Sequence, residues 1–102
     1  MSDDFFAPPP FKPDEALVAL RRQLRELRPL AERAIDGKPG FELKGKRVVE
    51  LVASADAITA RIVKRPAVSP EWDTCTLKNG ADVRKFVDDT KKRLARWTDE
   101  DS

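Results

Sequence analysis

The sequence predicts an α+β fold: a helix, a three-stranded antiparallel meander and a second helix, with both helices on one face of the sheet. Two segments repeat apolar residues with the period of a helix, and the segment between them alternates with the period of a strand. A sheet covered by both helices is the simplest way to bury two helical stripes. One domain is expected over residues 14–98, between a Pro- and Phe-rich flexible tail (1–13) and a frayed acidic end (99–102).

The first helix is expected to begin at Asp14 and Glu15, whose carboxylates favour the positive end of the helix dipole. Its apolar stripe advances in steps of three and four residues and comprises Leu17, Leu20, Leu24, Leu27, Ala31 and Ala34. Packing on a sheet is favoured over a coiled-coil seam, because Pro29 interrupts the helical hydrogen bonds. The helix is predicted to bend near Arg28 and to end by Gly37.

The meander is predicted between Phe41 and Lys64, where apolar and polar residues alternate and valine and isoleucine are frequent. Turns are expected at Gly45 and at residues 54–56. The face predicted to be buried comprises Val49, Leu51, Ile58, Ala60 and Ile62. The opposite face is mixed, since its valines are accompanied by polar residues: Val48, Val52 and Val63 with Glu50, Thr59 and Arg61.

A linker bracketed by Pro66 and Pro70 is predicted next, with one short helical turn starting at Ser69. The second helix is predicted from Ala81 to Trp97. Its apolar residues fall within about 80° of the helix circumference and comprise Val83, Phe86, Val87, Thr90, Leu94 and Trp97. This helix has the most regular periodicity in the chain.

The composition excludes more functions than it assigns. The chain has no histidine and a single cysteine, Cys75. Histidine is the usual general base, nucleophile activator and metal ligand, so triad hydrolysis, Cys-His chemistry and ordinary zinc sites are improbable. Adjacent carboxylates such as Asp88 and Asp89 diverge on a helix and do not converge on one cation. We therefore expect no catalytic, cofactor-binding or metal-binding residue, and no enzyme activity.

The expected location is the cytoplasm. A lone cysteine cannot form an internal disulfide, which argues against a disulfide-stabilised secreted domain. The first residues do not have the pattern of a signal peptide, and no apolar run approaches the ~20 residues of a membrane helix.

The leading functional hypothesis is a small non-catalytic module that binds an unidentified protein partner through its surface. The candidate interaction surface comprises Val48, Val52, Val63, Phe5, Phe6 and Phe11. The tail phenylalanines belong either to a disordered end or to a docking strip. A homodimer is favoured, because two helices cover only one sheet face and leave the outward valines in water. The alternative is a monomer in which Glu50, Thr59, Arg61 and edge lysines break up the apolar patch.

The alternative function is nucleic-acid binding through the basic meander, residues 44–65. The net charge is only +2, but basic residues concentrate in the middle of the chain, and the candidate patch comprises Lys44, Lys46, Arg47, Arg61, Lys64 and Arg65. Such patches normally act together with stacking aromatic residues. Tyrosine is absent and Phe41 lies on the apolar face, so this alternative is not favoured.

Overall fold

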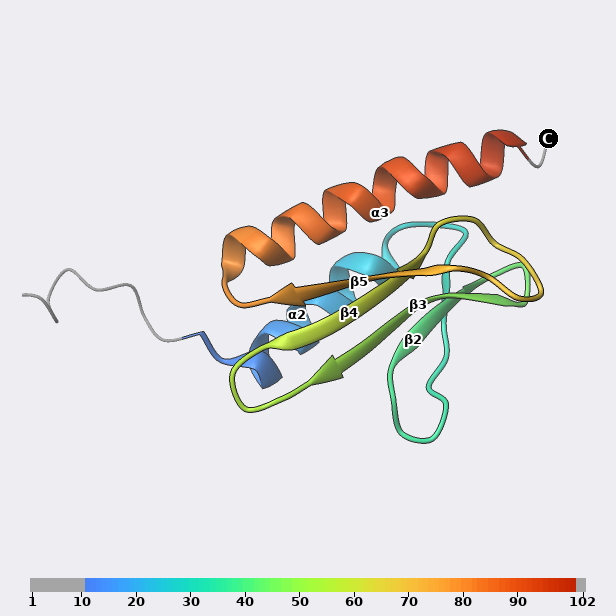
Figure 1. The fold of residues 1–102 in the computed structure, drawn as a ribbon. Helices are drawn as coiled ribbons and strands as arrows, with labels where there is room; N and C mark the ends of the chain where they lie inside the picture. The colour runs from blue at the N-terminus through green and yellow to red at the C-terminus, as the bar shows by residue number, and fades with distance from the viewer. Residues whose placement is uncertain (1–10, 101–102) are drawn as a thin grey trace, which may run out of the picture.

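The computed structural model describes residues 11–100 and contains two helices and one five-stranded antiparallel sheet (Figure 1). In chain order the elements are α2 (Pro13–Arg25), β1 (Ala31–Glu32), β2 (Gly40–Leu43), β3 (Lys46–Ala53), β4 (Ile58–Val63), β5 (Trp72–Leu77) and α3 (Gly80–Glu100). The strands lie in the sheet in the order β1-β2-β3-β4-β5. The fold is therefore α+β, and the prediction of a three-stranded meander with both helices on one face is wrong, because the sheet has five strands.

The strand β5 accounts for the larger part of this error. It pairs with β4 over its whole length, from Val63 opposite Trp72 to Ile58 opposite Leu77. The sequence prediction places a linker between Pro66 and Pro70 and assigns no strand to residues 72–77. The segment before the strand contains bends rather than the predicted helical turn at Ser69.

The first helix is shorter than predicted, and a two-residue strand follows it. The helix α2 ends at Arg25 because Pro29 lacks the N–H that a continued helix would use and clashes with the preceding turn. Ala31, predicted on the helical stripe, instead pairs with Glu42 in the sheet. Gly37, the predicted end of the helix, has φ of +78° in a turn, a conformation that glycine adopts without strain.

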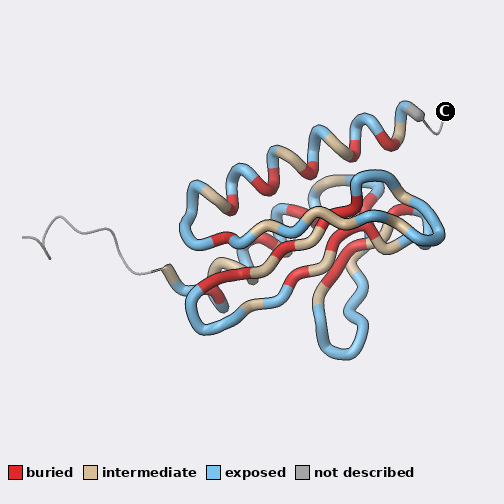
Figure 2. Tube along the Cα trace, in the orientation of Figure 1, coloured by how far each residue is buried: buried red, intermediate tan, exposed pale blue. Residues whose placement is uncertain are grey.

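One hydrophobic core joins the helices to the sheet. The helix α2 contacts β3 and α3, and α3 contacts β5. The buried side of α3 faces the sheet (Figure 2). Its predicted stripe is confirmed, since all six members are buried: Val83, Phe86, Val87, Thr90, Leu94 and Trp97. Leu20 and Leu24 contribute from α2 and have no exposed surface.

The predicted buried face of the meander is also confirmed, because its five members are fully buried: Val49, Leu51, Ile58, Ala60 and Ile62. The opposite face differs from the prediction, since Val48 and Val63 are fully buried too. A β-bulge explains Val48: the register shifts from Phe41 opposite Val49 to Glu42 opposite Arg47, which interrupts the alternation of side chains. Val63 lies opposite half-buried Trp72 in β5.

The C-terminal half of α3 is fixed to the ends of β4 and β5 by polar contacts. The Trp97 indole N–H donates to the carbonyl of Lys64 at 3.3 Å. The Arg93 guanidinium donates to the carbonyl of Val63 at 3.1 Å and forms an ion pair with Asp73 at 2.9 Å. These contacts determine where α3 lies along the edge strand.

The buried stripe of α3 gives a direct test of the fold. Phe86→Ala should lower the free energy of unfolding by about 3–5 kcal/mol, because it leaves a cavity beneath the helix. Lys91→Ala, an exposed position on the same helix, is the control and should stay within about 0.5 kcal/mol of the parent. Urea unfolding followed by circular dichroism measures both, and equal midpoints would contradict the placement of α3.

Candidate protein-interaction surface

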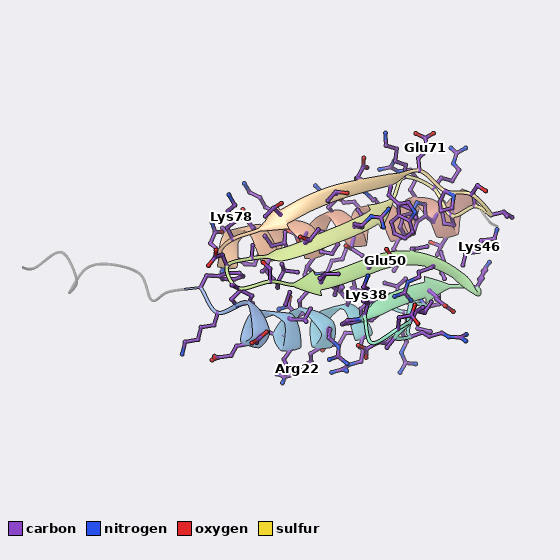
Figure 3. All side chains as sticks on the ribbon, turned by 60° about the horizontal axis from the view of Figure 1, so that its bottom comes forward. Arg22, Lys38, Lys46, Glu50, Glu71 and Lys78 are labelled. Atoms are coloured by element: carbon purple, nitrogen blue, oxygen red, sulfur yellow. The ribbon has the colours of Figure 1, made fainter. Side chains whose placement is uncertain are left out.

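The strand β5 forms one edge of the sheet. It pairs with β4 on one side, and no other strand within residues 11–100 pairs with it on the other side. Figure 3 shows this edge between the labelled residues Glu71 and Lys78, with α3 behind it. The edge strand is six residues long, which is enough to receive another strand.

One hydrogen bond just before β5 shows which residues of this strand direct their backbone groups toward β4 and which direct them outward. The N–H of Lys64 donates to the carbonyl of Glu71 at 2.9 Å, so these two residues form a hydrogen-bonded pair. Such pairs alternate along antiparallel strands. Asp73, Cys75 and Leu77 therefore direct their backbone groups toward β4. By the same alternation, the N–H and C=O groups of Trp72, Thr74 and Thr76 point away from the sheet.

The other edge of the sheet is much less available. The strand β1 has only two residues, and its Glu32 carboxylate is held by Arg21 and by Arg25. Short edges and charged side chains are the usual protection against strand addition. Within β5 there is no proline, no lysine and no shift of register, and its one charged side chain, Asp73, is paired with Arg93 at 2.9 Å. Thr74 and Thr76 are exposed, so β5 is the open edge of the sheet.

A groove of about 260 Å³ lies between β5 and the first half of α3, lined by Cys75, Thr76, Leu77, Asp82, Lys85, Phe86 and Asp89. Leu77 and Phe86 are buried and supply apolar surface. The charged residues come from α3. The groove therefore adjoins the open ladder and offers apolar and charged contacts to the side chains of an added strand.

Hydrogen bonds at the end of β5 limit the open ladder. The N–H of Lys78 donates to the Asp82 carboxylate at 2.9 Å, and the N–H of Asp82 donates to the Asn79 side chain at 2.8 Å. These contacts fix the tight connection from β5 to α3. Because the Lys78 amide is already bonded, the last fully available ladder position is Thr76.

The geometry gives Cys75 no sign of nucleophilic activation. Partial burial raises the pKa of the Cys75 thiol, Asp89 and Asp73 raise it further, and Arg93 opposes them. A reactive cysteine needs a lowered pKa. Over residues 11–100 there is also no group of three or more acidic or cysteine side chains placed to hold a metal ion.

No helix in the described part of the chain has the length and apolar character needed to span a membrane.

The predicted basic patch is largely committed to contacts within the protein. Glu50, in the middle of the outer sheet face, binds Arg47 at 3.0 Å and Arg61 at 2.9 Å. Arg47 also donates to the carbonyls of Arg33 at 2.8 Å and Lys38 at 3.2 Å. Its guanidinium occupies the space that a side chain at Gly40 would need, so this arginine joins β3 to the loop between β1 and β2.

The rest of the patch lies toward one end of the sheet. Lys64 is 3.8 Å from Asp73, and Lys44, Lys46 and Arg65 are exposed. The structure adds an aromatic residue that the sequence analysis did not place there: the Arg61 guanidinium lies 4.7 Å from the centre of the Trp72 ring. A second groove of about 330 Å³ adjoins this ring and is lined by Gly45, Lys46, Arg47, Ala67, Val68, Pro70 and Trp72.

Within residues 11–100, the predicted apolar interaction residues do not form one exposed surface. Val52 is 43% exposed, whereas Val48 and Val63 are fully buried, so the expectation that all three valines face solvent is wrong. Phe11 is half-buried and packs against the core cluster. Phe5 and Phe6 lie outside the described residues.

Comparison with protein-family models, curated proteins and solved structures found no significant match to the chain.

Sequence reasoning missed Thr74 and Thr76 because it missed their strand. A signal was present, since the run from Trp72 to Leu77 contains a tryptophan and two threonines, which are frequent in strands. Which backbone groups point outward depends on the partner strand β4. That information is absent from the local sequence.

Proline substitutions can test which residues of β5 direct their N–H toward β4. Cys75→Pro removes an N–H that bonds to β4 and leaves a carbonyl without its donor, which costs about 1–3 kcal/mol. Thr74→Pro removes an outward N–H and keeps the ladder to β4, as edge positions permit. Thermal unfolding should therefore show a markedly larger loss for Cys75→Pro. Equal losses of stability, or a larger loss for Thr74→Pro, would show that the inward and outward residues of β5 are assigned wrongly.

Proposed function

We propose that this protein is a small, non-catalytic interaction module that binds an extended segment of a protein partner along β5. The observation that carries this proposal is the open ladder at Trp72, Thr74 and Thr76 beside the groove under α3. An extended chain that adds to a sheet edge gains affinity from backbone hydrogen bonds. It gains specificity from the pockets that receive alternate side chains.

The added segment would present its side chains alternately to the two faces of the sheet. On the helix side they meet the groove, where Leu77 and Phe86 favour an apolar residue and Lys85 and Asp89 favour charged or polar neighbours. On the outer side they lie beside Thr74 and Thr76. We therefore expect the bound segment to be rich in β-branched residues and to carry a medium-sized apolar residue for the groove.

The interaction is expected to be modest in strength. Each backbone hydrogen bond contributes about 0.5–1.5 kcal/mol net, and burial of one apolar side chain contributes about 1.5–3 kcal/mol. Association and the ordering of a flexible segment oppose these gains. Such a balance suits reversible recognition rather than a permanent complex.

Ion pairing supports this choice over nucleic-acid binding. Arg47 and Arg61 share Glu50, and Lys64 is paired with Asp73, so at least these three residues of the basic patch are compensated by carboxylates. Nucleic-acid affinity depends on cations that can replace the counterions of phosphates.

The single cysteine of the chain supports a cytoplasmic location.

Peptide display tests the proposed function. A phage library of random peptides would be selected on sparsely immobilised protein, so that copies cannot reach one another. Thr76→Pro, which removes one outward N–H, is the comparison variant, and Thr76→Val is the control that retains this N–H.

The expected result is a set of β-prone peptides that bind the parent and Thr76→Val and lose at least tenfold in affinity for Thr76→Pro. The proposal is wrong if no peptide is enriched on the parent, or if the enriched peptides bind Thr76→Pro equally well. A circular dichroism melt of each variant first establishes that it is folded.

A further inference from the structure

We infer that a second copy of this chain is one partner that β5 accepts, in an antiparallel dimer with one continuous sheet across both copies. This inference rests on the proposed function, because it uses the same edge. The occupant is a second copy because the open edge of β5 is complementary to the same edge of another molecule. Three features of the described residues support it.

The first feature is the symmetry of the open ladder. Outward groups at Thr74 and Thr76 lie on either side of Cys75, so a twofold axis at Cys75 places Thr74 of each copy opposite Thr76 of the other. Each such pair exchanges two backbone hydrogen bonds. Threonines opposite one another across strands are also favourable neighbours.

The second feature is charge, which selects this register over its neighbour. A twofold axis at Thr74 would place Asp73 of both copies diagonally across the interface, about 7–8 Å apart. The axis at Cys75 instead places Asp73 opposite Leu77 of the second copy and separates the two carboxylates further. Asp73 is already held by Arg93 at 2.9 Å within its own chain.

Charged residues beside the groove are also complementary across the same twofold axis. Cys75 lines it together with Phe86, so an axis at Cys75 passes near the part of α3 that carries Lys85 and Asp89. These residues lie one helical turn apart and have opposite charge. Asp89 binds Arg93 of its own chain at 2.9 Å. Twofold symmetry would also bring Lys85 of one copy toward Asp89 of the other, on both sides of the axis.

The third feature is that the assembly closes. Joining two β5 edges leaves β1 as the edge at each end of the combined sheet. Each β1 has two residues and a Glu32 carboxylate bound by arginines, so it offers no comparable ladder for another copy. The expected product is a finite dimer rather than a fibre.

Sedimentation equilibrium over a concentration series, from low micromolar to several hundred micromolar, tests this inference on the full chain. The expected result is a molar mass that rises from 11.5 kDa toward twice that value. Thr74→Lys combined with Thr76→Lys places lysines opposite one another across the interface, and this variant should stay monomeric throughout. Val52→Lys, on the exposed outer face, is the matched control and should dimerise like the parent.

Cross-linking through the native Cys75 gives a second measurement. It uses the parent protein and does not depend on whether an edge variant folds. A short bismaleimide should join two copies of the parent at concentrations where the mass has doubled. It should not join them at concentrations where the mass is that of a monomer. Cys75→Ser is the blank.

A parent that stays at 11.5 kDa at every concentration overturns the inference. So does a dimer that persists in the double lysine variant, or one that Cys75 fails to cross-link. A monomeric parent that still selects edge-dependent peptides leaves the proposed function intact. A dimer without peptide selection restricts the edge to self-association.

Discussion

Backbone hydrogen bonding between neighbouring strands organises this molecule, because a meander satisfies the polar groups of each strand only where another strand lies beside it. The central strands β3 and β4 have neighbours on both sides, and their inward residues Leu51, Ile58 and Ile62 have no exposed surface. The helices cover apolar side chains but donate no ladder bonds. Within residues 11–100 the last strand therefore has no neighbour on one side, and this is the side that we propose as the binding surface.

The position of α3 makes that edge usable. Arg93 and Trp97 fix the C-terminal half of the helix to the carbonyls of Val63 and Lys64. The N-terminal half borders the groove beside Cys75 and Leu77. The same helix thus completes the core with Phe86 and forms one wall of the proposed site. On the outer face, by contrast, Glu50 draws Arg47 and Arg61 into internal pairs, which leaves that face with a structural role.

Sequence periodicity was sufficient for α3 and for β2, β3 and β4, because each of these has one face in the core. Periodicity failed where one local feature of the backbone, a proline or a β-bulge, changed the pattern. Pro29 ended α2 early, and the bulge in β3 turned Val48 into the core. The candidate site was not predictable from the sequence, since the outward direction of Thr74 and Thr76 depends on pairing with a strand more than ten residues away. A local pattern reports which residues favour a strand but does not report which side of that strand remains unpaired.

Amide hydrogen exchange, resolved by residue with NMR, tests the central claim of an open β5 edge most directly. In dilute solution the amides of Thr74 and Thr76 should exchange far faster than those of Asp73, Cys75 and Leu77, because only the latter bond to β4. Raising the protein concentration should slow the two threonine amides selectively. Slow exchange of Thr74 and Thr76 at the lowest concentration would contradict the account, since it would show that this side of β5 is already satisfied within a single chain.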